Sequence, residues 1–232
     1  MINKLLFWLN GYEVRRKRLL DKVPEGPLRE FLSVPFPTPE TLIEDTPILS
    51  VDFETTGLHA INDKLLSVGC VSLEQGQIKL PTCYHQVIRS KGELKASNVV
   101  IHQITDDIKE RGAQLAKVVE ALLAALAGKV MLVHFGRIEK QFLAQACIEL
   151  YGMAPVYPMI DTLALAKRRF DKSDTPYDPS ELRLSNLRDR YQLPRHYAHN
   201  ALSDAVATAE LLLALIHHKR RKHPARLQDF LL

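Results

Sequence analysis

The sequence has few cysteines and contains no long hydrophobic run. Its three cysteines, Cys70, Cys83 and Cys147, are odd in number, far apart and set among apolar residues. This pattern is typical of reduced thiols in a core, and it argues against a disulfide framework or a zinc site. The apolar stretch at residues 5–9 is too short for the core of a signal peptide, and the basic run at residues 15–18 follows it instead of preceding it. We therefore expect a cytoplasmic protein with no membrane span.

Internal repeats, low-complexity segments and a strong excess of one charge are also missing. The 232 residues are 46% hydrophobic and 25% charged, which is ordinary for a globular protein and sufficient for a well-buried core. The net charge of +4 is compatible with a polyanionic partner, although many proteins without such a partner are equally basic. Composition therefore identifies neither a partner nor an activity.

Proline content divides the chain. Residues 1–22 have a helical pattern of apolar and basic residues, whereas residues 23–47 contain prolines at a density that regular elements do not tolerate. We predict an N-terminal helical extension with a proline-rich linker over residues 1–46, a main domain over residues 47–218 and a basic C-terminal tail over residues 219–232.

From residue 48 onward, strand and helix patterns alternate. Apolar stretches predict strands, the first three of them joined as an antiparallel meander, at residues 48–54, 64–73, 78–88 and 130–133, with a short apolar stretch at 159–160. Helical periodicity predicts helices at residues 96–102, 113–126, 138–151, 162–169, 184–191 and 202–218. This order of elements predicts an α/β fold, in which a mixed sheet is flanked by helices.

Two carboxylates stand close together at the end of the first predicted strand. Asp52 and Glu54 are two residues apart, and alternate residues of a strand project from the same face. Like charges held that close destabilise a half-buried surface unless a cation lies between them. The pair therefore predicts a divalent metal site above the strand.

Two motifs resemble those of a known enzyme family. Asp-Phe-Glu-Thr-Thr-Gly-Leu at residues 52–58 resembles the first motif of the DEDDh 3′-5′ exonucleases, the family of the proofreading epsilon subunit of bacterial DNA polymerase III. His-Asn-Ala-Leu-Ser-Asp-Ala at residues 199–205 resembles the third motif, in which a histidine precedes an aspartate by five residues. The resemblance covers about residues 47–218. It implies a ribonuclease H-like fold and phosphodiester hydrolysis with two metal ions.

The resemblance also implies a role for each of these residues. Two Mg²⁺ or Mn²⁺ ions ~4 Å apart activate water and stabilise the leaving oxygen, and such hard cations prefer carboxylate ligands. By the family pattern, Asp52 bridges both ions, and Glu54 and Asp204 complete the ion on the nucleophile side. His199 is then the general base, because a histidine that is largely neutral at cytoplasmic pH accepts a proton during attack.

The second motif departs from the family pattern. Where the family has His-Asn and then Phe-Asp, this chain has His-Phe at residues 134–135 and then Ile-Glu at residues 138–139. Glu139 stands where the second aspartate is expected, and its longer stem predicts a shifted or weaker second ion. Asp161 is the competing candidate for the fourth carboxylate, although its place just before a predicted helix favours a role as N-cap.

The turn after the first strand is the expected contact with the substrate. Backbone groups of Thr55, Thr56 and Gly57 are suited to hold the 3′-terminal nucleotide over the metal ions. Leu58 has two equally weighted interpretations, as a wedge against the terminal base or as a core residue.

These features together predict a two-metal 3′-5′ exonuclease that acts on single-stranded or frayed DNA ends and releases nucleoside monophosphates. An exoribonuclease and a nucleic-acid-binding module with impaired catalysis remain alternatives. The C-terminal residues 228–232 faintly resemble peptides that dock on sliding clamps. A polymerase or a clamp is therefore a further expected partner, which would place the protein in DNA replication or repair.

Overall fold

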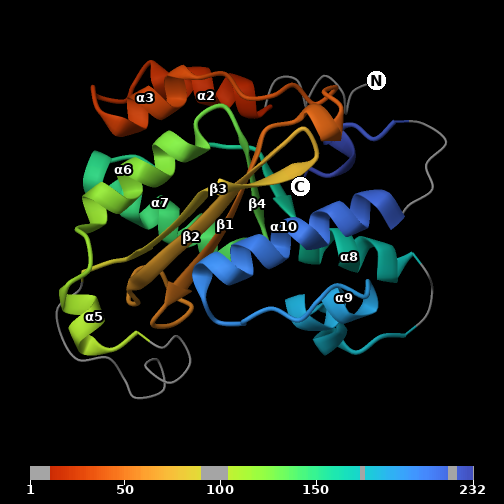
Figure 1. Cartoon of the computed structure of the whole chain (residues 1–232). Coiled ribbons are helices and arrows are strands. Elements are labelled where there is room, and N and C mark those ends of the chain that lie inside the picture. Colours follow the sequence, from red (N-terminus) through yellow and green to blue (C-terminus); the bar gives the residue numbers. More distant parts are fainter. Residues whose placement is uncertain (1–10, 90–103, 173–175, 219–223, 232) are drawn as a thin grey trace.

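A mixed sheet of five strands lies at the centre of the computed structural model, which describes residues 11–89, 104–172, 176–218 and 224–231 (Figure 1). The strand order is β3-β2-β1-β4-β5, with antiparallel pairing among the first three strands and parallel pairing from β1 to β5. The strands are β1 (Ile48–Thr55), β2 (Leu65–Glu74), β3 (Gln77–Val87), β4 (Val130–Val133) and β5 (Met159–Asp161). The predicted α/β fold, with a meander followed by parallel strands, is confirmed.

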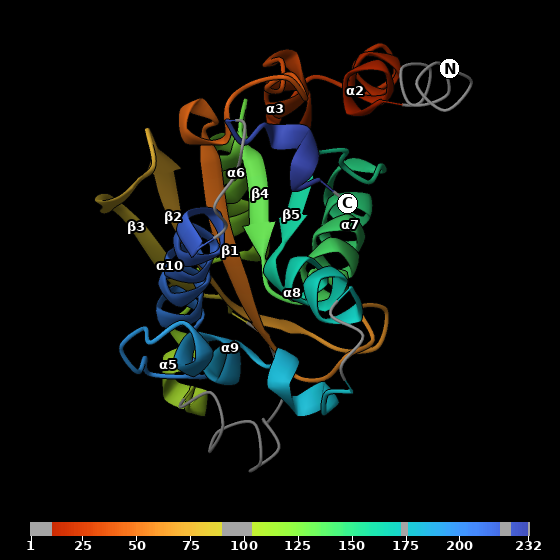
Figure 2. The same ribbon diagram turned by 90° about the vertical axis from the view of Figure 1, so that its right-hand side faces the viewer.

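Helices cover both faces of the sheet (Figures 1 and 2). One face packs against α6 and α7, and the other against α10, which also contacts α8 and α9. Alternation along β1 explains the two faces, because Leu49, Val51 and Phe53 join the α6 and α7 side whereas Ile48 joins the α10 side. The helices on this part of the chain are α5 (Asp106–Glu110), α6 (Leu115–Leu126), α7 (Arg137–Tyr151), α8 (Thr162–Asp171), α9 (Leu184–Arg190) and α10 (Ala201–His218).

Most predicted boundaries agree with the structure to within two residues. The strand at 130–133 is reproduced as predicted, and the last helix begins at Ala201 where residue 202 was expected. The helix predicted at residues 96–102 lies outside the described residues, as do residues 1–10 of the extension and residues 219–223 of the tail. The three cysteines are free, and Cys70 and Cys147 are buried as expected, but Cys83 is exposed on β3.

The proline-rich segment contains a helix, so the prediction that it holds no regular element is wrong. Helix α3 (Pro27–Ser33) begins with Pro27 at its first position, where an N–H group would have no partner within the helix, so proline costs no hydrogen bond there. Its apolar side chains Leu28, Phe31 and Leu32 are almost fully buried and belong to the cluster that contains α6 and α7. This segment is therefore part of the packed core.

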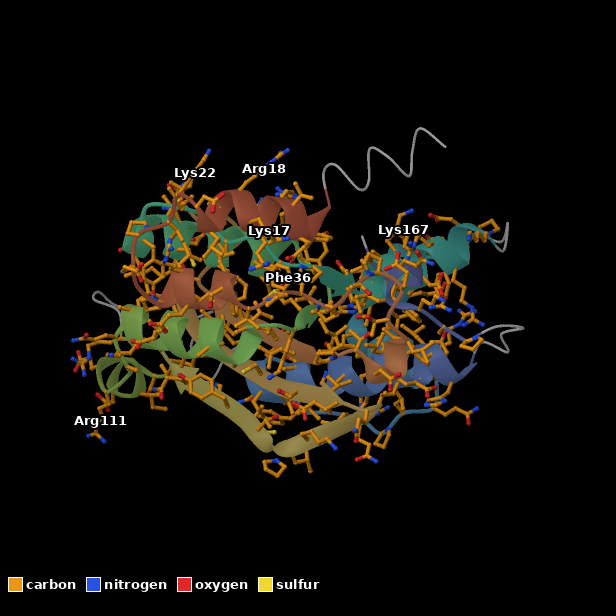
Figure 3. All side chains as sticks on the ribbon, turned by 90° about the horizontal axis from the view of Figure 1, so that it is seen from above. Lys17, Arg18, Lys22, Phe36, Arg111 and Lys167 are labelled. Carbon is orange, nitrogen blue, oxygen red and sulfur yellow. The ribbon has the colours of Figure 1, made fainter. Side chains whose placement is uncertain are left out.

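Helix α2 (Tyr12–Leu20) lies against α3 and carries much of the exposed positive charge of the extension. Lys17, Arg18 and Lys22 are exposed, and Arg18 and Lys22 extend away from the ribbon in Figure 3. Arg16 is buried, pairs with Glu13 and donates to the carbonyl of Leu32. The basic run at residues 15–18 therefore includes one arginine with a structural role. Among the described helices, none has the length and apolar character needed to cross a membrane.

The C-terminal residues 227–231 are packed into the molecule, which argues against the predicted clamp-binding peptide. The short helix η3 (Leu227–Asp229) is followed by Phe230 and Leu231, and the side chains of Leu227, Phe230 and Leu231 are buried in the cluster beneath α10. Arg226 pairs with Leu42 as an isolated bridge and donates to the carbonyl of Glu40. Apolar side chains with these burials are not available to a partner protein.

The packing of α3 predicts that Leu32→Ala destabilises the whole domain. Leu32 is 0% exposed, so its truncation removes buried apolar surface and leaves a cavity, at a cost of about 2 to 3 kcal/mol in the free energy of unfolding. Urea denaturation measures this change. Leu80→Ala is the matched control, because Leu80 on β3 is 64% exposed and should change stability by less than about 0.5 kcal/mol. Equal, small changes in both variants would show that α3 does not contribute to the core.

Candidate active site

Three carboxylates meet at the carboxyl end of β1. Asp52 and Glu54 project from β1, and Asp204 comes from the first turn of α10, about 150 residues later in the sequence. One oxygen from each of the three groups lies within 4.8 Å of the others. Glu54 and Asp204 are buried, and Asp52 is partly exposed. The sequence prediction placed all three residues in one site, and the structure brings them together.

Asp204 lies close to Asp52 and Glu54 because α10 packs tightly on the sheet. Gly69 on β2 is paired with Asp52, and a Cβ added at Gly69 would lie 2.2 Å from backbone atoms of Ala201 and Leu202. A side chain at residue 69 would therefore push the start of α10 away from β1. The hydroxyl of Ser50 donates to the carbonyl of Ala205 at 2.7 Å and fixes the helix on the same face. Asp204 thus reaches the β1 carboxylates because residue 69 is glycine.

The fourth carboxylate approaches from the opposite side of the sheet. Glu139 lies in the first turn of α7 and is 3% exposed. Its electrostatic interactions with Asp161, Glu54 and Asp52 place it beside the β1 carboxylates. Among the described residues, its Oε2 atom has no hydrogen-bond partner. Glu139 therefore offers a buried, unused oxygen to the site.

Burial and mutual repulsion raise the pKa of two of these carboxyls. The pKa of Asp52 is well above its ordinary value because burial disfavours the charged form and because Glu139, Asp204 and Glu54 repel the charge. Burial is also the largest cause at Glu139, whose pKa rises to about 8 although backbone hydrogen bonds oppose the increase. The four groups therefore form a site of strong negative potential.

This donor set fits a divalent cation. Hard cations such as Mg²⁺ and Mn²⁺ prefer carboxylate oxygens, and three of them are already gathered within ligand distance of one centre. A bound cation would also relieve the repulsion at Asp52 and provide a partner for the Oε2 atom of Glu139. The repulsion that the sequence predicted between Asp52 and Glu54 therefore extends to Asp204 and Glu139.

Asp161, the competing candidate, is occupied by the backbone. It is the N-cap of α8, and its Oδ1 accepts from the N–H groups of Leu163 and Ala164. The same carboxylate also accepts from Phe135 at 3.1 Å and from Gly136 at 2.9 Å. A group that already accepts four hydrogen bonds is poorly placed to bind a cation. Its predicted role as N-cap is confirmed, and its contacts with the turn before α7 were not visible from sequence.

The loop before α10 brings two histidines to Asp204. The backbone N–H of His199 donates to Oδ2 of Asp204 at 2.8 Å, while the side chain of His199 is exposed and the residue has a φ of +65°. His196, which the sequence prediction missed, places Nε2 2.9 Å from Oδ1 of Asp204 with its side chain only 10% exposed. A second histidine three residues upstream in the same loop was the available signal. Arg188 supports this loop by donating to the carbonyl of Pro194.

The turn after β1 is tightly organised. Thr55 donates to the carbonyl of Gly57 at 2.8 Å, and the Thr56 hydroxyl contacts Asp63 and the backbone N–H of Lys64. A Cβ at Gly57 would lie 2.5 Å from the Asp63 carboxylate, which explains the glycine. Leu58 is 62% exposed, so the interpretation of Leu58 as a core residue is wrong.

Comparison with protein families gives one match that covers most of the chain. The family model described as "Exonuclease" (RNase_T) matches residues 49–212. Among curated proteins, the chain is 26% identical over 181 residues to DNA polymerase III subunit epsilon of Treponema pallidum, covering 78% of this chain and 81% of that protein. It is also 26% identical over 182 residues to the PolC-type DNA polymerase III of Thermotoga petrophila. That match covers 78% of this chain but only 13% of the polymerase.

Solved structures share the fold at low sequence identity. A complex of exonuclease I from E. coli with single-stranded DNA and zinc superposes with a TM-score of 0.65 at 14% identity, over 76% of this chain and 42% of that chain. The nuclease domain of 3′hExo, a DEDDh family member bound to rAMP, superposes with a TM-score of 0.61 at 16% identity, over 74% of this chain and 92% of that domain.

Proposed function

Because the chain belongs to the DEDDh 3′-5′ exonuclease family, we propose that it hydrolyses phosphodiester bonds at the 3′ ends of single-stranded or frayed DNA. The products are nucleoside monophosphates, and the reaction uses two divalent ions, Mg²⁺ or Mn²⁺. The observation that carries this proposal is the gathering of Asp52, Glu54 and Asp204, with Glu139 beside them, at the end of one strand.

The four carboxylates are the residues that would hold the two ions. Bound there, two divalent cations supply activation of the attacking water and stabilisation of the leaving oxygen. Asp52 interacts electrostatically with all three other carboxylates, so it would help to hold both ions, and Glu139 would hold the second. His199 accepts the proton of the attacking water, since its backbone is anchored to Asp204 and its exposed ring is free to turn toward the substrate.

The turn after β1 positions the terminal nucleotide. The hydroxyls of Thr55 and Thr56, the N–H of Thr56 and the carbonyl of Gly57 already make contacts within the turn, so we assign the contact with the nucleotide to the remaining backbone groups of Thr55, Thr56 and Gly57. Leu58 is exposed and supplies an apolar surface to the terminal base. Contacts of this kind tolerate every base, which suits an enzyme that removes successive nucleotides.

A direct assay tests this proposal. Single-stranded DNA and RNA of one sequence, labelled at the 5′ end, are incubated with the protein and Mg²⁺ or Mn²⁺. We expect a ladder of products shortened from the 3′ end, release of mononucleotides, loss of the reaction in EDTA, and faster cleavage of DNA. Faster cleavage of RNA would favour the exoribonuclease alternative. Tight binding of either strand without any release would leave only a binding module.

The cellular setting is part of the same proposal. Two relatives are components of DNA polymerase III, so we infer that the protein acts in DNA replication or repair, in contact with a polymerase. The three free cysteines support a cytoplasmic location, where thiols stay reduced. We do not propose a clamp partner, because the C-terminal side chains of Leu227, Phe230 and Leu231 are buried.

A further inference from the structure

An exposed aromatic side chain, that of Phe135, lies in the turn after the strand that pairs with β1. Phe135 follows β4 in the turn that leads into α7, and 45% of its surface is exposed. Strand β4 runs parallel to β1 with Leu132 paired to Ser50, so the chain after Val133 leaves the sheet about level with Asp52. Glu139 lies one helical turn further along α7. The backbone turn at Phe135 therefore lies between the strand that carries Asp52 and the helix that carries Glu139.

The backbone of Phe135 has a conformation that bulky residues rarely adopt. Its φ is +68°, in the left-handed region, where the Cβ atom of an L-residue crowds its own backbone. The contacts around it enforce this conformation, because Asp161 accepts from the N–H groups of both Phe135 and Gly136. Gly136 has no room for a side chain, since a Cβ there would lie 2.5 Å from Val133.

Neither burial nor backbone preference accounts for a phenylalanine at this position. A large apolar side chain that is left in solvent loses hydrophobic stabilisation, and asparagine or glycine would adopt the positive φ at lower cost. Strained residues of this kind cluster at functional sites. An aromatic ring in this place has a use if a planar group packs against it.

We propose that Phe135 is a stacking platform for a base of the single-stranded substrate near the scissile phosphate. The inference rests on the proposed function, because it takes the strand to be the one whose 3′ end lies over Asp52, Glu54 and Asp204. Aromatic rings stack on any base, so the contact adds affinity and positions the strand without sequence preference. Together with Leu58, which follows β1, Phe135 would give the strand a second apolar contact from a separate part of the chain, after β4.

The substitution Phe135→Asn separates binding from folding. Asparagine tolerates a positive φ, so thermal unfolding should show unchanged or increased stability. Loss of the ring should weaken binding of a 5′-labelled hexanucleotide roughly tenfold, measured by fluorescence anisotropy with Ca²⁺ in place of Mg²⁺. Phe135→Trp should retain the parent affinity. Ile148→Asn is the matched control, because Ile148 is 47% exposed at the far end of α7 and should leave affinity unchanged.

Abasic substrates test the stacking itself. Hexanucleotides with one abasic residue at the first, second or third position from the 3′ end are bound by the parent and by Phe135→Asn. For one of these positions the two proteins should bind with equal affinity, because the base that stacks is already absent. An unchanged affinity of Phe135→Asn for the intact strand, or the same loss on every abasic strand, would overturn the stacking role. Release of mononucleotides by the parent is followed in parallel, so a failure of the proposed function is recognised separately.

Discussion

Asp52→Ala should lower the rate of nucleotide release by at least about a thousandfold and at the same time stabilise the protein in EDTA. Asp52 lies among three other carboxylates, so its removal takes away the group best placed to serve both ions. Without metal, the same removal relieves repulsion among buried negative charges. We expect a melting temperature roughly 2 to 5 °C above that of the parent in EDTA, measured by thermal unfolding. Added Mn²⁺ should stabilise the parent more than the variant.

Asp189→Ala is the control for this experiment. Asp189 is an exposed carboxylate on α9, and its replacement should leave both the rate and the melting temperature in EDTA near the parent values. An Asp52→Ala variant that keeps the parent rate would show that the carboxylate cluster is not the catalytic centre. A variant that is inactive but less stable in EDTA would mean that Asp52 holds the fold together, contrary to the repulsion inferred for the metal-free site.

Much of this site could be predicted from sequence because its parts are local. The pair Asp52 and Glu54 follows from the two-residue period of a strand, and the structure keeps both on the α10 face. Asp204 could be connected to them only through the resemblance, since no local rule relates residues about 150 positions apart. The strands and helices were predictable where the hydrophobic period was long and regular, as in β4 and α10.

The remaining features depend on tertiary contacts that no local pattern encodes. Gly69 matters because α10 crosses β2 at that residue, and a glycine inside a predicted strand does not reveal what lies against it. His196 meets Asp204 through the path of a loop. The helix α3 forms among prolines because burial of its apolar side chains against α6 outweighs the composition around it. In each case the deciding contact comes from a distant part of the chain.

Substitution of Glu139 should give the second large effect, which is on the pH dependence of stability as well as on activity. Its pKa is about 8 in the folded protein against an ordinary value of 4.5, so between these values the native state holds a proton that the unfolded state has lost. The free energy of unfolding in EDTA should therefore fall as pH rises from about 4.5 to 8, by up to about 1.4 kcal/mol per pH unit for this proton. The raised pKa of Asp52 acts in the same direction.

Glu139→Gln should remove the contribution of this proton, so the free energy of unfolding should fall less steeply as pH rises. The raised pKa of Asp52 should still contribute to that fall. Urea denaturation in EDTA at pH 5, 6, 7 and 8 measures the difference between the two proteins. Because the amide cannot replace a carboxylate as a ligand, nucleotide release should fall roughly a hundredfold. Glu139→Asp, which introduces the residue usual in the family, should stay within about tenfold of the parent rate, since it keeps the charge.

Asp161→Asn distinguishes the two candidates for the fourth carboxylate. Its loss of hydrogen bonds to the N–H groups around α8 and the turn before α7 should destabilise the protein by about 1 to 3 kcal/mol. The fall of stability with pH should become shallower, because the charge of Asp161 helps to raise the pKa of Glu139, but it should remain, because burial is the largest cause. If Glu139→Gln keeps full activity while a folded Asp161→Asn variant loses it, then Asp161 is the ligand.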